Sequence, residues 1–169
     1  MCIFTVMKTS ITTSILAIFA IALSTTVKAQ NVAVDHYTSG KFECAIFPES
    51  YPTDLGGKPF TPSHDQADEA LKGLETSLKK LKVDNKDNRD DILKNIAKYK
   101  VQIFGVTDKN GAKILFLNWF RNDDNKDKDL AANWLTDMIL VQDGGIYFWT
   151  IKYDADKHEF FEFKTNGNG

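Results

Sequence analysis

Cysteine is scarce in this chain, which has only Cys2 and Cys44 among its 169 residues. Cys2 precedes an apolar N-terminal run that we expect to be removed, which leaves Cys44 alone. A single cysteine excludes an internal disulfide, so packing must hold the fold together. No cysteine stands near the expected cleavage point, so the sequence gives no indication of a lipid anchor.

The chain also lacks a strong excess of charge of either sign. It has 21 Lys+Arg against 23 Asp+Glu, a formal charge of −2. Loss of residues 1–29 would remove Lys8 and Lys28 and leave a formal charge of −4. A charge this small and mixed argues against binding of nucleic acid through bulk electrostatics.

Long apolar runs are lacking, apart from residues 15–23 near the N-terminus. Lys8 precedes this run and small residues follow it up to Ala29, which is the order of a secretory signal. The run is too short to cross a bilayer core of about 30 Å, which needs about 20 apolar residues.

We therefore predict a signal peptide over residues 1–29 and a secreted or periplasmic mature protein without stable membrane insertion. Translation starts at Met1 or Met7, and the sequence leaves both starts open.

Familiar catalytic motifs are missing as well. The chain has no Gly-x-Ser-x-Gly, no His-Glu-x-x-His and no phosphate loop. Cys44 is a candidate nucleophile with His36, His64 or His158 as base, but its apolar neighbours favour a buried structural thiol. The three histidines lack metal-ligand spacing, and we predict no cofactor.

A calcium loop is half present at residues 123–129. Acidic or amide side chains alternate there at Asp123, Asn125, Asp127 and Asp129. Lys128 stands where such a loop needs glycine, and the bidentate glutamate at its end is absent. We therefore predict a solvated loop and no metal.

The clearest element that is present is a helix over residues 63–81. Ser63 and Gln66 have the spacing of a capping box, and leucines recur at three and four residues. Acidic residues near its start and lysines near its end match the helix dipole. A shorter helix is expected over residues 90–97.

Strand patterns occupy most of the remaining chain. Asn110-Gly111 and Asp143-Gly144 predict hairpin turns. Residues 30–62 are expected to be irregular, with one short strand over 41–47, and residues 63–169 to hold helices and sheet, all within one globular domain (30–169). The other expected strands cover residues 100–106, 112–120, 134–141, 146–153 and 159–164.

These elements predict an α+β fold, with one long and one short helix packed on a curved antiparallel meander of four or five strands. The arrangement resembles cystatin-like and NTF2-like domains as an analogy of architecture, which carries no function.

Both faces of the predicted sheet are apolar, so both need a cover. The helices would cover one face. For the other, the favoured cover is the segment 32–60, and the alternatives are a partner subunit, which would give a homodimer through a sheet face, or a bound ligand.

A few polar residues interrupt the apolar strands and could line a pocket, with solvated strand ends as the ordinary alternative. They are Asn118, Asp137, Thr150 and Lys152. Aromatic residues supply much of the energy of binding interfaces, although they also fill cores. The predicted binding residues are Trp119, Trp134, Trp149, Tyr153, Asn118 and Asp137.

The sequence therefore favours a non-enzymatic binding module for a peptide, a protein partner or an apolar small molecule. Two alternatives stay open. One is a small hydrolase or isomerase with a pocket between sheet and helix, since acidic residues are plentiful. The other is a structural protein that dimerises.

Overall fold

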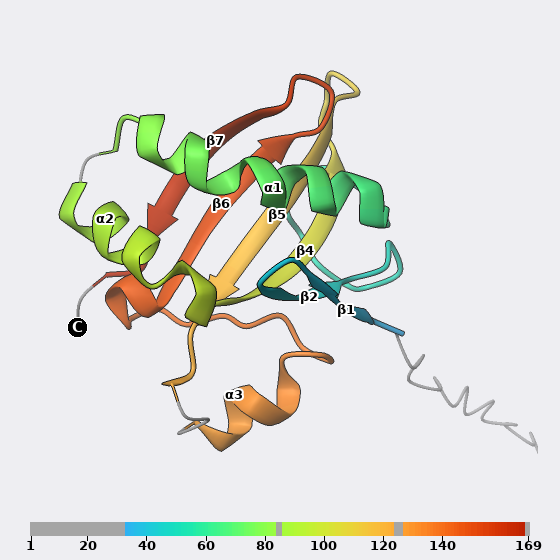
Figure 1. Ribbon diagram of the computed structural model, residues 1–169. Helices are drawn as coiled ribbons and strands as arrows, with labels where there is room; N and C mark the ends of the chain where they lie inside the picture. Colours follow the sequence, from blue (N-terminus) through green and yellow to red (C-terminus); the bar gives the residue numbers. More distant parts are fainter. Residues whose placement is uncertain (1–32, 84–85, 124–126, 168–169) are drawn as a thin grey trace, which may run out of the picture. The chain divides into compact units, whose positions relative to one another are not determined.

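A mixed β-sheet forms the centre of the fold. The computed structural model describes residues 33–83, 86–123 and 127–167, so the expected signal peptide lies outside the described residues. The sheet has the strand order β1-β2-β4-β5-β6-β7, and β3 pairs with the far end of β4 (Figure 1). The strands are β1 (Asp35–Ser39), β2 (Phe42–Ile46), β3 (Lys58–Phe60), β4 (Lys100–Thr107), β5 (Lys113–Phe120), β6 (Phe148–Asp154) and β7 (Glu159–Thr165).

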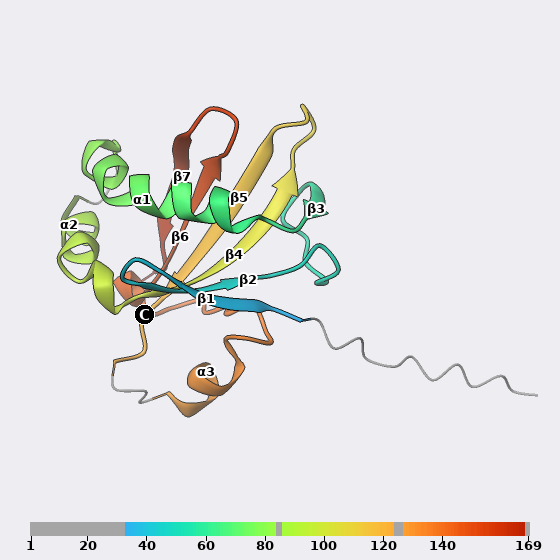
Figure 2. The ribbon, with the colours of Figure 1, turned by 45° about the vertical axis from the view of Figure 1, so that its right-hand side comes forward.

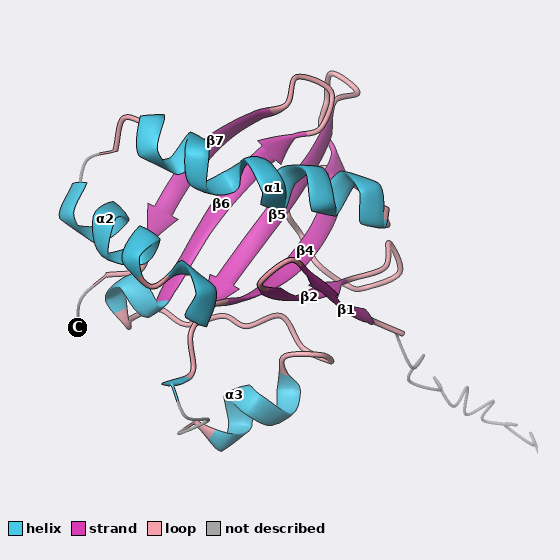
Figure 3. Cartoon of the chain, in the orientation of Figure 1, coloured by secondary structure: helices cyan, strands magenta, loops and turns pink. Residues whose placement is uncertain are grey.

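The two longer helices and a short 3₁₀ helix lie on one face of this sheet (Figure 3). They are α1 (His64–Lys80), α2 (Lys86–Lys94) and the short 3₁₀ helix η1 (Ile96–Lys98). The predicted capping box is confirmed, because the Ser63 hydroxyl accepts from the Gln66 backbone and the Gln66 side chain accepts from the Ser63 backbone. The apolar stripe of α1 is buried and consists of Ala67, Ala70, Leu71, Leu74 and Leu78.

The N-terminal part of the sheet corrects the prediction of an all-antiparallel meander. The expected strand over 41–47 is present as β2, but it pairs in parallel with β4. Parallel pairing requires a crossover connection, and α1 and α2 provide it on the helix side. Strands β1 and β3, which were not predicted, pair with β2 and β4 (Figure 2).

The C-terminal strands β4, β5, β6 and β7 form an antiparallel meander, as predicted. The hairpin at Asn110-Gly111 is confirmed, although five residues rather than two connect Thr107 to Lys113. Within the part of the chain that the structure describes, no helix is both long and apolar enough to cross a bilayer.

The predicted strand over 134–141 and its hairpin at Asp143-Gly144 are wrong. Residues 128–133 form helix α3 (Lys128–Asn133), and the chain then continues without a strand until β6. Strand β6 pairs directly with β5, with Trp149 opposite Trp119. It begins at Phe148 because Gly145–Tyr147 forms a 3₁₀ turn after Gly144, whose φ is +105°.

The mistaken strand pattern has a physical origin. Residues 134–139 cross the sheet face opposite α1, here called the second face. Trp134, Met138 and Ile139 pack on this face and the next apolar residues do not, with Leu140 78% exposed. Pairs of packed residues (134–135 and 138–139) are therefore separated by pairs of exposed ones (136–137 and 140–141), without the one-by-one alternation of a strand and without strand pairing.

The second face is covered by two segments of the chain itself. Tyr51 and Leu55 from the loop after β2 pack against Phe104, as part of a cluster that also includes Leu130 of α3 and Trp134. The expectation that the segment 32–60 covers this face is thus correct in part, because α3 and the chain that follows it share the task.

Two buried amide side chains attach this cover to the sheet. The Gln102 amide nitrogen donates to the carbonyls of Trp134 and Asp137 at 2.7 Å each, and its oxygen accepts from the Ile139 backbone at 2.8 Å. The neighbouring Asn118 donates to Gln102 at 3.0 Å and to the Ile139 carbonyl at 2.8 Å. An irregular segment has no ladder partners for its backbone, so these amides satisfy groups that would otherwise be buried unpaired.

We expect Gln102→Leu to destabilise the fold and to loosen residues 134–139. The change leaves two carbonyls and one N–H without a partner, each costing about 1–3 kcal/mol if it stays buried. Urea unfolding should show a loss of more than about 2 kcal/mol, and hydrogen exchange at the Ile139 amide should accelerate. Gln142→Leu, at an exposed glutamine of the same segment, is the matched control. Equal stability and exchange in both variants would contradict this role.

Candidate functional site

The cover leaves one end of the second face open, and a cavity of about 380 Å³ lies there. Its base is a row of cross-strand neighbours at the turn end of the sheet, where Val106 pairs with Ile114, Ile114 with Asp154 and Asp154 with Glu159. The lining residues are Leu55, Gly56, Val106, Asp108, Ile114, Lys152, Asp154, Lys157, Glu159, Phe160, Phe161 and Glu162.

The floor of the cavity is apolar. Val106 and Ile114 stand on neighbouring strands at 5% and 6% exposure, and the half-buried Phe161 continues the floor toward the sheet edge. Leu55, from the loop after β2, supplies the opposite wall. Apolar surface of this kind in a concave site is typical of small-molecule binding sites.

An ion pair borders the floor on the β7 side. The Lys152 ammonium lies 2.9 Å from the Glu162 carboxylate and 6.0 Å from the centre of the Phe161 ring. Glu162 has a φ of +50° and lies where the pairing of β6 with β7 shifts register between Thr150 and Lys152. This bulge directs Glu162 toward Lys152, as bulges at sheet edges commonly re-aim a side chain.

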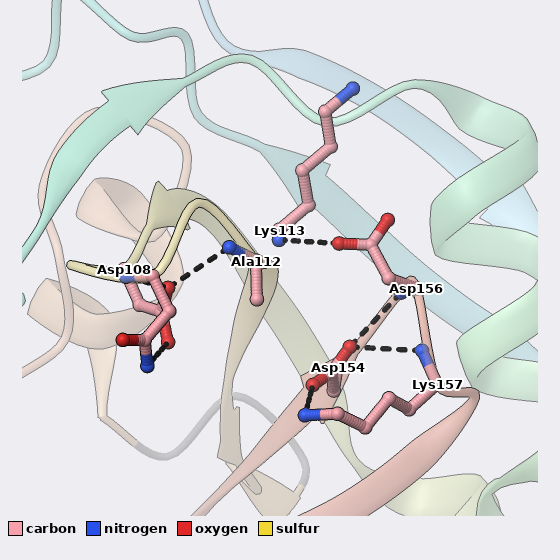
Figure 4. A network of polar contacts seen from close by, with 7 residues as sticks. Asp108, Ala112, Lys113, Asp154, Asp156 and Lys157 are labelled. Atoms are coloured by element: carbon pink, nitrogen blue, oxygen red, sulfur yellow. Dashed lines mark hydrogen bonds and ion pairs between the residues drawn. The ribbon is translucent and has the colours of Figure 1, made fainter.

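Two hairpin turns form the rim of the cavity (Figure 4). In the β6–β7 turn, Asp154 accepts hydrogen bonds from the backbones of Asp156 and Lys157 and from the Lys157 ammonium at 2.8 Å. In the β4–β5 turn, Asp108 accepts from the backbones of Asn110 and Ala112. Asp156 joins the two turns by accepting from the Lys113 backbone at 3.0 Å.

These hydrogen bonds keep the rim carboxylates ionised. The hydrogen bond from Lys157 is the main cause that lowers the pKa of Asp154, and the bond from the Ala112 backbone is the main cause that lowers the pKa of Asp108. The pKa of Lys157 is raised, first by its hydrogen bond to Asp154. The rim is thus a set of fixed charges around neutral pH.

The six predicted binding residues do not lie together. Trp119 and Trp149 are buried on the helix side, stacked with ring centroids 4.9 Å apart, and neither indole N–H has a hydrogen-bond partner among the described residues. Tyr153 is buried on the same side, and burial raises its pKa. None of these three side chains lines the 380 Å³ cavity.

The other three predicted residues belong to the second face. Trp134 belongs to the cover and is buried against the sheet, with its ring in a T-shaped contact with His36 at 5.1 Å between centroids. Asn118 serves the cover as described, and it also lines a smaller hollow of about 80 Å³ with Thr150. Asp137 is exposed and contributes its carbonyl to Gln102.

Among the polar strand residues singled out by sequence, Lys152 is the one that lines the cavity. The rest of the site was missed. The sequence placed Phe161 and Glu162 in a short last strand and gave them no role. The available signal was that Lys152, a charged residue in an apolar strand, has the opposite charge of Glu162 on the neighbouring strand. Asp108 and Asp154 fall next to predicted turns, where aspartate ordinarily binds local backbone and gives no sign of a site.

Cys44 is a buried thiol and not a reactive one. It donates a weak hydrogen bond to the Phe42 carbonyl at 3.5 Å, and burial raises its pKa to about 12. A nucleophilic cysteine needs a lowered pKa. The histidines pair elsewhere, with His64 2.6 Å from Asp35 and His158 2.7 Å from Glu69.

Two carboxylates of the acidic loop after β5 have local partners. Asp127 caps α3 by accepting from the Leu130 backbone at 2.9 Å, and Asp123 lies 3.1 Å from Arg121. Across the described residues, no group of three or more histidine, cysteine or acidic side chains is arranged to hold a metal ion.

Comparison with protein-family models, with curated proteins and with solved structures finds no match to this chain.

We expect Asp154→Asn to destabilise the protein by about 1–2 kcal/mol at pH 7, because a buried charged acceptor of three hydrogen bonds is lost. The pKa of Asp154 is lower in the folded than in the unfolded chain. The contribution of Asp154 to the free energy of unfolding is therefore complete above its unfolded pKa of about 3.9. It disappears as the pH falls through the lower pKa of the folded protein.

Denaturant unfolding at a series of pH values measures this dependence. The stability curves of wild type and Asp154→Asn should converge in acid. Asp143→Asn, at an exposed aspartate outside the rim, should parallel wild type. A constant difference between wild type and Asp154→Asn at every pH would show that the carboxylate charge is not the cause.

Proposed function

We propose that this domain is a non-enzymatic binding module that holds a small molecule with an apolar part in the cavity of the second face. The observation that carries the proposal is the apolar floor of Val106, Ile114 and Phe161, over which the described residues leave a cavity. Its size, about 380 Å³, falls at the lower end of the range of about 300–1,000 Å³ that is typical of small-molecule sites.

The electrostatics favour binding over hydrolysis. A general acid that works at neutral pH needs a raised pKa, yet the pKa values of Asp108 and Asp154 are lowered. Lys152 is held in its ion pair with Glu162. The cavity also lies on the sheet face opposite α1, whereas the sequence pointed to a pocket between sheet and helix. A hydrolase or isomerase and a dimerising protein stay alternative predictions.

We further propose that the module acts after export from the cytoplasm. Support comes from the sequence, in which a lysine, a short apolar run over 15–23 and small residues up to Ala29 stand in the order of a signal peptide. Mass spectrometry of the protein from an exporting host should find a mature N-terminus at Gln30 or Asn31.

The binding proposal is tested with N-phenyl-1-naphthylamine, a neutral apolar dye whose fluorescence rises when it leaves water. We expect saturable binding to the wild type and strong loss of binding in Ile114→Trp, because the larger side chain fills the floor of the cavity. Val141→Trp adds the same ring to an exposed site outside the cavity and should bind the dye as the wild type does.

Circular dichroism establishes that both tryptophan variants fold. If Ile114→Trp does not fold, Phe161→Ser removes floor area from the edge strand and should weaken dye binding. Absence of saturable dye binding to wild type, or equal binding by wild type and a folded cavity variant, would overturn the proposal.

A further inference from the structure

The charges that line the cavity are unequal. The lining includes the carboxylates of Asp108, Asp154, Glu159 and Glu162 against the ammonium groups of Lys152 and Lys157, a net charge of −2. The two lysines are each engaged by an acid, Lys152 by Glu162 and Lys157 by Asp154. Asp108 and Glu159 therefore have no cation of their own among the described residues of the cavity.

Asp108 and Glu159 lie at the same end of the cavity as Asp154. Glu159 is the cross-strand neighbour of Asp154 at the start of β7. Its side chain is exposed, and its carboxylate has no hydrogen bond or ion pair with the described residues. Asp108 accepts hydrogen bonds only from neutral N–H groups among the described residues, and Lys157 acts on it through its charge without a direct contact. Lys157 responds to all three carboxylates, since the charges of Asp154, Glu159 and Asp108 each raise its pKa.

Lys157 cannot neutralise this end of the cavity alone. Its ammonium is one positive charge shared by three carboxylates, and its side chain is 67% exposed. A second cation at this end would meet uncompensated negative charge, whereas an anion would be repelled by it. At the other end, an anion could reach Lys152 only by displacing Glu162 from its 2.9 Å contact.

We propose that the natural ligand is a small aliphatic amine, whose ammonium group lies at the Asp108–Glu159 end of the cavity and whose apolar stem lies on Val106, Ile114 and Phe161. This inference rests on the proposed binding function and names its ligand class. The size of the cavity favours a small molecule over a protein side chain with its attached backbone.

The test compares three ligands that share one chain length and differ only in the head group: octylamine, 1-octanol and octanoate. Displacement of the neutral dye, or calorimetry, gives their affinities for the wild type. We expect octylamine to bind more tightly than 1-octanol, and octanoate to bind roughly tenfold or more weakly than octylamine, because like charges oppose it.

The role of the Glu159 carboxylate, which has no partner of its own among the described residues, is tested in the variant Glu159→Gln. We expect its affinity for octylamine to fall about two- to fivefold, as for one partly exposed ion pair, and its affinity for 1-octanol to stay unchanged. Glu49→Gln makes the same change at an exposed glutamate outside the cavity and should leave all three affinities unchanged. Glu159→Lys should abolish most of the preference for the amine.

The outcomes separate the two proposals. Binding of 1-octanol together with equal affinities for octylamine and octanoate would overturn the amine proposal and leave the binding function standing. A preference for octylamine that Glu49→Gln reduces as much as Glu159→Gln would also overturn it, because bulk charge would then explain the preference. If none of the three ligands binds and the neutral dye does not bind either, the binding function fails.

Discussion

The fold depends on how a sheet with two apolar faces accepts an irregular cover. Helices satisfy their own backbone groups and can lie on apolar side chains without further help. The segment after α3 cannot, because four of its backbone groups are directed at the sheet: the carbonyls of Trp134, Asp137 and Ile139 and the Ile139 N–H. Gln102 and Asn118 accept and donate the hydrogen bonds that these groups need. A buried polar pair in the middle of the sheet thus allows irregular chain to cover this part of the second face.

The position of this pair also sets the extent of the cover. Gln102 and Asn118 stand opposite each other in the β4–β5 register, two residues from Phe104 and Phe116 and four from Val106 and Ile114. The segment after α3 is attached at the pair Gln102 and Asn118. The loop after β2 reaches the next pair, Phe104 and Phe116, through the contact of Tyr51 with Phe104. The cross-strand pair Val106 and Ile114 lies beyond the attachment of residues 134–139, and there the loop after β2 contributes Leu55 to the wall of the cavity.

The sequence was sufficient for elements with a repeating pattern. The helix with its capping box, the strand over 41–47 and the four-stranded meander follow from periodicity and turn residues, which depend on neighbours in the chain. The strand over 134–141 failed because a mostly apolar run next to a glycine turn signal also occurs in a loop that packs on a sheet face, and a short apolar run does not separate the two. The parallel pairing of β2 with β4 depends on a crossover, which no local pattern encodes.

The residues of the cavity show the same difference between features that depend on chain neighbours and features that depend on the folded sheet. Large aromatic residues were predicted to bind, but Trp119 and Trp149 are buried in the core, where such rings are commonest. Lys152, which lines the cavity, was singled out because a charge inside an apolar strand is visible in the local sequence. Asp108, Glu159 and Glu162 have ordinary surroundings in the sequence. They matter only because two hairpins end side by side, which is a property of the folded sheet.

The crossover between β2 and β4 also bears on the order in which the chain folds. The hairpins β4–β5 and β6–β7 join neighbours in the chain and close small loops. The pairing of β2 with β4 closes a loop that contains both α1 and α2, and the pairing of β5 with β6 closes one that contains α3. Longer loops lose more entropy on closure and form more slowly. The two hairpins that carry the rim of the cavity therefore belong to the early, local part of folding, and the N-terminal edge of the sheet is added after the helices have formed.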